Sequence, residues 1–135
     1  MKNKLKFFLL LALLFSLQSK AQLDTLNYLK QFEINKANYI GYPFSKLLNN
    51  MTQIQPMAVW NTPPRNNKNI GTKTGFSFCK MQNSFHNTIT LMIVWQQPIP
   101  NTQTHYYEQL NDFYFTNDEK LFFGNKIVKD IMVYR

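Results

Sequence analysis

The side chains that could carry out chemistry are few, and the sequence does not group them. A thiol nucleophile could come only from Cys79, and a base for it only from His86 or His105. Cysteine-dependent hydrolysis needs a thiolate within hydrogen-bond reach of a histidine, and a helix N-terminus is a usual place to stabilise that thiolate. Cys79 instead falls in a run typical of a β-strand, with no cysteine-protease signature around it. A small cysteine-dependent hydrolase is therefore the least favoured function.

Metal, carboxylate and phosphate chemistry also lack a pattern. The two histidines form no H-x-x-x-H motif, the single cysteine forms no C-x-x-C motif, and the four glycines build no phosphate-binding loop. Among the seven acidic residues, Asp118 and Glu119 are better explained as the first turn of a helix than as a pair of glycosidase carboxylates. We predict no catalytic residue, no metal site and no cofactor.

The start of the chain has the pattern of a secretory signal peptide. A basic segment precedes an apolar stretch over residues 7–17, and the small residues Ser19 and Ala21 suit signal peptidase. The apolar stretch is shorter than the roughly 20 residues that a membrane-spanning helix needs. We therefore predict that residues 1–21 are cleaved off after Ala21. The mature chain, residues 22–135, is expected to be a single domain in the periplasm or outside the cell, without stable membrane insertion.

Removal of the signal peptide halves the net charge. The chain carries 15 Lys and Arg against 7 Asp and Glu, a formal net charge of +8 at pH 7. Lys2, Lys4, Lys6 and Lys20 lie in the signal peptide, which leaves 11 cations against 7 acids, a net charge of +4. Nucleic-acid binding depends on clustered cations. A charge this mild, on a chain that leaves the cytosol, does not favour a nucleic-acid partner.

Aromatic residues are frequent, and they favour a binding role. The chain has 12 Phe, 7 Tyr and 2 Trp, and three of the Phe lie in the signal peptide, so 18 aromatic residues remain. A core of this size cannot easily hide them all, and amphipathic rings serve protein and glycan surfaces alike. Cys79, without a partner in its own chain, is predicted to be a buried small side chain or a free thiol. The predicted binding residues are Trp60, Arg65, Trp95, Tyr106 and Tyr107, with Tyr42 as a further exposed candidate.

Hydrophobic spacing predicts two helices followed by three strands. Leucines at helical spacing predict a helix over residues 24–34, and Pro43 suits the first turn of a second helix over residues 43–51. The polar residues 62–74, with two prolines and three asparagines, are predicted to form a long exposed loop. β-branched and aromatic runs predict strands over residues 54–61, 75–82 and 88–96.

Two further helices are predicted from their caps. Thr102 or Thr104 can cap a helix that carries several aromatic residues. Thr116 and Glu119 have the spacing of a capping box, and Gly124 is placed to end the helix that follows. We prefer this short helix to a hairpin at the same place.

A last strand completes the predicted domain. Residues 126–134 alternate, with Ile131 and Val133 on one face and Val128 and Met132 on the other. The element order is then ααβββααβ. This order predicts an α+β fold, with a mainly antiparallel sheet of about four strands and helices packed on one face.

Two segments carry a resemblance to other proteins. Residues 39–48 read Y-I-G-Y-P-F-S-K-L-L, and residues 123–131 read F-G-N-K-I-V-K-D-I. Together they resemble small secreted bacterial proteins of unassigned function, which share a leader ending in Ala-Gln, a Y-I-G-x-P-x-S-x-L-L helix start and a C-terminal strand of this kind. The resemblance implies secretion and a single fold, and it implies no catalytic residue.

These patterns favour an exported, soluble, non-catalytic binding protein whose partner is a protein or another envelope component. One specific form is an immunity-type protein that blocks a toxin directed at the cell envelope, a role that suits small size, export and the lack of catalytic groups. The alternative is a small-ligand or glycan-binding module that uses exposed Trp and Tyr side chains.

Overall fold

The computed structural model describes residues 23–84 and 86–135. The predicted signal peptide lies outside these residues. No helix in the described part of the chain combines the length and the apolar character needed to cross a membrane.

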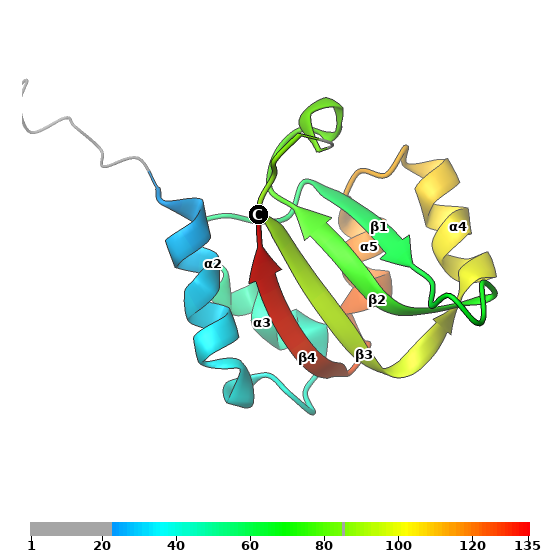
Figure 1. Cartoon of the computed structure of the whole chain (residues 1–135), viewed down its shortest axis with the longest axis horizontal. Helices are drawn as coiled ribbons and strands as arrows, with labels where there is room; N and C mark the ends of the chain where they lie inside the picture. The colour runs from blue at the N-terminus through cyan, green and yellow to red at the C-terminus, as the bar shows by residue number, and fades with distance from the viewer. Residues whose placement is uncertain (1–22, 85) are drawn as a thin grey trace, which may run out of the picture.

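The domain is α+β, as predicted, and its helices and strands follow the predicted order ααβββααβ (Figure 1). The four strands form one antiparallel sheet in the order β1-β2-β3-β4. Short 3-10 turns lie at Lys36–Asn38 and Met81–Asn83. The elements are α2 (Thr25–Ile34), α3 (Phe44–Asn50), β1 (Ala58–Thr62), β2 (Ile70–Ser77), β3 (Thr90–Pro100), α4 (Asn101–Leu110), α5 (Asn117–Gly124) and β4 (Val128–Tyr134).

The core lies between the sheet and the two helices α3 and α5, which lie behind it in Figure 1. Aromatic rings fill its centre. The Phe76 ring centroid is 4.8 Å from that of Phe44, 5.6 Å from Phe115 and 5.7 Å from Phe123, and Trp95 stacks on Phe123 at 5.8 Å. Helix α2 flanks β4 on one side of the sheet, and α4 flanks β1 on the other (Figure 1).

One of the two predicted helix caps is present, and Asp24 caps a third helix. Asp24 caps α2, because its carboxylate accepts the Asn27 backbone N–H at 3.2 Å. Thr116 and Glu119 form the predicted capping box of α5. The predicted threonine cap of α4 is wrong: Pro100 is the N-cap, and the Thr104 hydroxyl instead donates to a carbonyl inside the helix.

The predicted loop over residues 62–74 is wrong in its second half, because β2 begins at Ile70. Its polar residues are held by tertiary contacts, and Thr74 is buried where its hydroxyl accepts the Trp95 indole N–H at 2.7 Å. Strand β3 likewise continues to Pro100, past the predicted end of the strand. Pro98 is tolerated there because it falls where the β2–β3 register shifts and no ladder hydrogen bond is required.

The predicted faces of the last strand need one correction. Val128 pairs with Trp95, whereas Asp130 pairs with Val94, so the β3–β4 ladder contains an irregularity between these positions. An extra residue in one strand reverses the side to which the following side chains point. Val128 is therefore buried in the core with Ile131, instead of sharing the opposite face with Met132.

Each outer edge of the sheet is closed by a glutamate. On β4, the Val133 backbone N–H donates to the Glu33 carboxylate at 3.0 Å. On β1, the Asn61 backbone N–H donates to the Glu108 carboxylate at 3.1 Å. Unpaired N–H groups on an edge strand otherwise invite pairing with another chain. Each carboxylate occupies one of the donors that an added strand would use, and backbone bonds from Val59 to Phe113 and from Val128 to Tyr42 occupy one more on each edge.

Two carboxylates beside β4 make the stability depend on pH. A hydrogen bond from Lys30 at 2.6 Å lowers the pKa of Glu33 from its ordinary 4.5, and Lys36 at 2.6 Å lowers that of Asp130 from 3.8. Because each folded pKa lies below the unfolded one, the stabilisation is complete above the ordinary pKa and is lost as pH falls through the folded pKa. Both pairs are partly exposed, so the effect is modest.

We expect the free energy of unfolding to be flat near neutral pH and to fall upon acidification below about pH 4.5, measured by urea titration at a series of pH values. The double variant Glu33→Gln, Asp130→Asn should show a shallower fall over the same range. An unchanged slope in that variant would assign the acid sensitivity to other groups.

Candidate functional site

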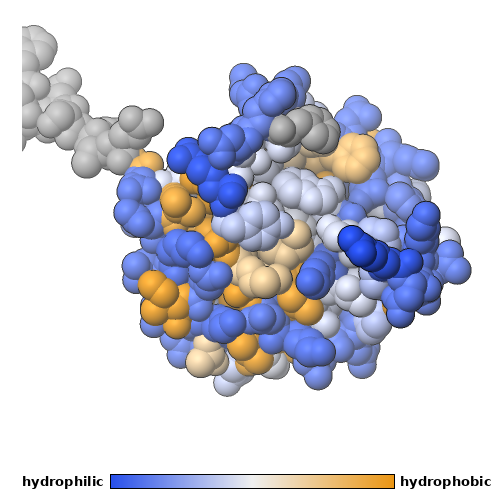
Figure 2. Space-filling view, viewed as in Figure 1, coloured by the Kyte–Doolittle hydropathy of each residue, from blue (hydrophilic) through white to orange (hydrophobic). Residues whose placement is uncertain are grey.

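The face of the sheet that turns away from α3 and α5 is the candidate binding surface. Strand pairing places side chains in rows across it, and the central row consists of Trp60, Gly75, Met92 and Met132. Figure 2 looks onto this face, where weakly polar side chains lie at the centre, apolar ones continue toward the lower left, and hydrophilic ones cover most of the rest. We call this surface the open face.

The Trp60 ring lies against the sheet in the space that a side chain at Gly75 would fill. A Cβ built on Gly75 would lie 2.5 Å from Cε2 of Trp60 and 2.8 Å from its Nε1, distances that real Cβ atoms do not show. The indole therefore rests on the backbone of β2, a close approach that only glycine permits. This packing fixes the ring without burying it, since Trp60 stays partly exposed.

The Trp60 ring lines a cavity of about 450 Å³ together with Met81, Ser84 and Phe113. We call it the Trp60–Phe113 cavity. Its lining is mainly apolar, and Ser84 supplies a hydroxyl that lies 3.2 Å from the Ser77 hydroxyl. This volume lies in the range of small-ligand pockets, about 300–1,000 Å³.

Phe113 reaches the cavity through an unusual turn. Asp112 and Phe113 both have positive φ, 49° and 63°, a backbone region that non-glycine residues rarely adopt. The turn is held by β1, because the Val59 backbone N–H donates to the Phe113 carbonyl at 2.9 Å. Phe113 is 39% exposed. Local bonds from Phe113 to Glu108 and from Tyr114 to Asn111 complete the turn. Sequence reasoning missed Phe113 as a site residue, because its place beside β1 depends on the tertiary hydrogen bond from Val59.

The two tryptophans predicted to bind lie on opposite faces of the sheet. Trp60 is on the open face, as described above. The prediction that Trp95 is exposed for binding is wrong: Trp95 is 3% exposed, and its indole N–H donates to the buried Thr74 hydroxyl. Its side chain belongs to the core because it alternates with Val94, which lies on the open face.

The other predicted binding residues lie outside the cavity. Tyr106 and Tyr107 are on α4, with ring centroids 5.1 Å apart, and Tyr106 is 59% exposed. Tyr107 is partly buried and packs against Phe122 of α5 at 4.7 Å. Arg65 is exposed in the connection between β1 and β2. The structure therefore does not bring the predicted set together.

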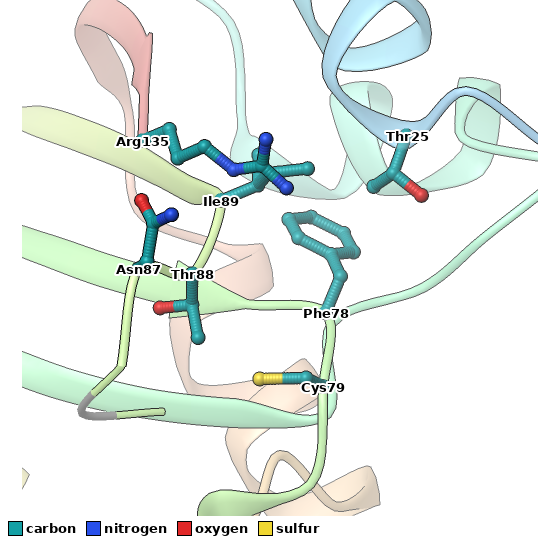
Figure 3. A pocket seen from close by; sticks show the side chains of 7 residues that line it. All are labelled: Thr25, Phe78, Cys79, Asn87, Thr88, Ile89 and Arg135. Atoms are coloured by element: carbon teal, nitrogen blue, oxygen red, sulfur yellow. The ribbon is translucent and has the colours of Figure 1, made fainter. Parts of the chain in front are cut away.

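Cys79 follows the end of β2 and is partly buried. Its Sγ lies 3.9 Å from the Ser84 hydroxyl. It also lines a second cavity of about 260 Å³ between the β2–β3 connection, the start of α2 and the chain end. In Figure 3 the Phe78 ring lies between Cys79 and Thr25, and the Arg135 guanidinium lies beside Ile89. Within residues 23–84 and 86–135, no three His, Cys, Asp or Glu side chains gather as a metal site would require.

Buried polar side chains are satisfied throughout the described part of the chain, where none lacks a hydrogen-bond partner. One such network runs from Trp95 through Thr74 to Asn61, whose amide donates to Asn101 at 2.6 Å. This network connects β1 to the start of α4.

Comparison of the sequence and structure with protein-family models, with curated proteins and with solved structures found no match.

Proposed function

We propose that this is an exported, non-catalytic binding protein that docks an apolar or aromatic side chain of its partner in the Trp60–Phe113 cavity. The proposal depends above all on one observation, the Trp60 indole packed on Gly75 at a mainly apolar cavity on the open face. Export is supported by the pattern of the first 21 residues. An immunity-type role is a special case, because blocking a toxin needs a rigid docking surface and no chemistry.

The cavity is suited to binding because its walls are fixed before a partner arrives. Trp60 cannot move toward β2, and Phe113 is set by a turn that β1 holds through a backbone hydrogen bond. Side chains that are already ordered lose little entropy on association, so more of the contact energy remains as affinity. Buried aromatic anchors of this kind dominate many protein interfaces.

A glycan is the weaker alternative. Sugars stack on tryptophan, but their hydroxyls also need several hydrogen-bond partners in the site. Among the described residues, Ser84 brings the only side-chain hydroxyl to the cavity, and its oxygen already lies within hydrogen-bond distance of Ser77. The observations therefore favour an apolar or aromatic group over a sugar ring.

Heteronuclear NMR of the labelled mature domain can test the site with p-cresol, which has the shape of a tyrosine side chain. We expect p-cresol to shift the indole N–H resonance of Trp60 and to leave that of Trp95 in place, with Trp60→Phe used to assign the two. N-acetylglucosamine and a peptidoglycan disaccharide are titrated in parallel. A response to the sugars alone would establish the glycan alternative, and no response to any probe would overturn the proposed site.

Gly75→Ala should remove binding while the fold is kept. The new methyl group requires the Trp60 ring to leave the sheet, at a cost of about 1–3 kcal/mol in stability. We expect the apparent affinity for p-cresol, obtained from the shift of the Trp60 resonance, to fall at least about tenfold. This corresponds to about 1.4 kcal/mol. Gly124→Ala is the matched control, because its Cβ would meet the nearest atom at an ordinary 3.6 Å. Equal behaviour of the two variants would contradict the role of Gly75.

A further inference from the structure

Charge is distributed unequally around the domain. The lysine–carboxylate ion pairs of the described residues, Lys30 with Glu33 and Lys36 with Asp130, lie along α2 and β4. The cations on and around the open face differ, because none of them forms an ion pair with another described residue. These cations are Lys73 on β2, Lys80 in the β2–β3 connection, and Arg65 and Lys68 in the β1–β2 connection. Lys73 shares a row of the open face with Val94 and Asp130. Together with the hydrogen bond from Lys36, the charge of Lys73 lowers the pKa of the Asp130 carboxyl.

Two of these cations lie close in the chain to residues that form the Trp60–Phe113 cavity. Lys73 is two residues before Gly75 on the same face of β2, about 7 Å along the strand from the place where the Trp60 ring rests. Lys80 directly precedes Met81, which lines the cavity from the β2–β3 connection. Both lysines are exposed. The strand that supports Trp60 and the connection that supplies Met81 therefore each carry an exposed lysine.

We propose that the partner is a protein segment that places an apolar or aromatic side chain in the cavity and carboxylates on both sides of it, toward Lys73 and Lys80. This inference rests on the proposed function and adds the chemical class of the partner. Complementary charge at the rim of an interface steers association and fixes the orientation of the partner more than it adds affinity. The aromatic anchor supplies the affinity, and the lysines select among segments that offer such an anchor.

The hydrogen bonds at the edges of the sheet determine how that segment can dock. The edges of the sheet bond to Glu33 and Glu108, so the partner binds across the open face through its side chains instead of extending the sheet. Asp112, which directly precedes Phe113 in the connection between α4 and α5, is exposed. The carboxylates of the partner are therefore directed away from Asp112, along the line of β2.

An anionic membrane would also be attracted to lysines, but the apolar groups here suit it less. Membrane-binding surfaces insert protruding apolar side chains into the bilayer. In the central row of the open face, Trp60 rests on the sheet and Met92 is buried, so the apolar groups of that row are recessed, whereas Phe113 at the edge is 39% exposed. A recess accepts a side chain that protrudes from a partner.

Isothermal titration calorimetry at low salt tests the proposal with capped peptides that carry a central phenylalanine. One peptide has two aspartates on each side, and matched peptides have asparagines or lysines instead. We expect the aspartate peptide to bind about tenfold more tightly than the asparagine peptide, and the lysine peptide to bind most weakly. Lys73→Gln and Lys80→Gln should each reduce the preference for aspartate about threefold. Lys120→Gln, on α5, is the control and should leave that preference unchanged.

The outcomes separate this inference from the proposed function. Equal binding of the aspartate and asparagine peptides, with both lost in Gly75→Ala, would overturn the acidic partner and leave the cavity as a binding site. Failure of every peptide together with failure of p-cresol would overturn both. Binding to vesicles that contain phosphatidylglycerol is measured last. If the protein binds these vesicles, loses that binding in Lys73→Gln and Lys80→Gln, and binds no peptide, the partner is an anionic membrane instead of a protein.

Discussion

Phe76→Ala is expected to lower the free energy of unfolding by about 3–5 kcal/mol, which would leave little of the stability of a typical domain. Phe76 is 0% exposed on the central strand β2 and contacts the rings of Phe44, Phe115 and Phe123. Its removal opens a cavity between the sheet and both core helices. Because these rings come from different elements, the surrounding structure has little freedom to collapse into the space.

Urea titration followed by circular dichroism measures this loss. Phe113→Ala is the matched control, since it removes the same atoms from a ring that is 39% exposed on the open face. We expect it to cost far less stability and to weaken p-cresol binding instead. If both variants lose the same free energy of unfolding, the buried packing of the Phe76 ring does not make the large contribution to stability proposed here.

Glu119→Ala is expected to cost about 2–4 kcal/mol, the second largest effect. Glu119 is 1% exposed, and its carboxylate accepts the Thr116 backbone N–H at 2.8 Å, the Thr116 hydroxyl at 2.5 Å and the Asn111 amide at 2.7 Å. The alanine variant removes the acceptor of the Thr116 N–H and hydroxyl, and leaves the Asn111 amide only its longer contacts, to the Thr116 hydroxyl at 3.3 Å and to Asp118 at 3.5 Å. A buried donor without a partner costs more than a hydrogen bond contributes on average.

Two controls define the origin of that loss. Glu119→Gln keeps the shape of the side chain and one acceptor oxygen, so its loss should lie between wild type and alanine. Asp118→Ala removes the neighbouring exposed acid from the same helix turn, and it should cost at most about 1 kcal/mol through the helix dipole. Thermal unfolding of the three variants in parallel gives the ranking. An alanine variant no worse than Asp118→Ala would show that the Glu119 hydrogen bonds contribute little.

Local signals in the sequence predicted the element types well, because caps and hydrophobic spacing act within a few residues. The Asp24 cap and the Thr116–Glu119 capping box depend only on neighbours in the chain, and both are present. The α+β order followed from these local signals. Residues 70–74 were missed as a strand because their polar side chains show no strand pattern, and Thr74 is buried by pairing with β1 and β3 and by its hydrogen bond with Trp95.

The candidate site was predictable only in part, for a related reason. Trp60 and Trp95 both fall in apolar strands, and nothing in the pattern of either strand says which ring faces the helices. The choice depends on register with neighbouring strands, which pairs Trp60 with Gly75. Phe113 could not be recognised because its place beside β1 depends on the hydrogen bond from Val59.

The contact between Trp60 and Gly75 makes these two positions depend on each other during evolution. Any side chain at position 75 takes the space of the indole, so it can be accommodated only once position 60 carries a smaller or differently placed residue. Position 75 therefore cannot change before position 60 has changed. In a lineage that keeps the cavity they are inherited as a pair, and in one that loses it both are free to drift together.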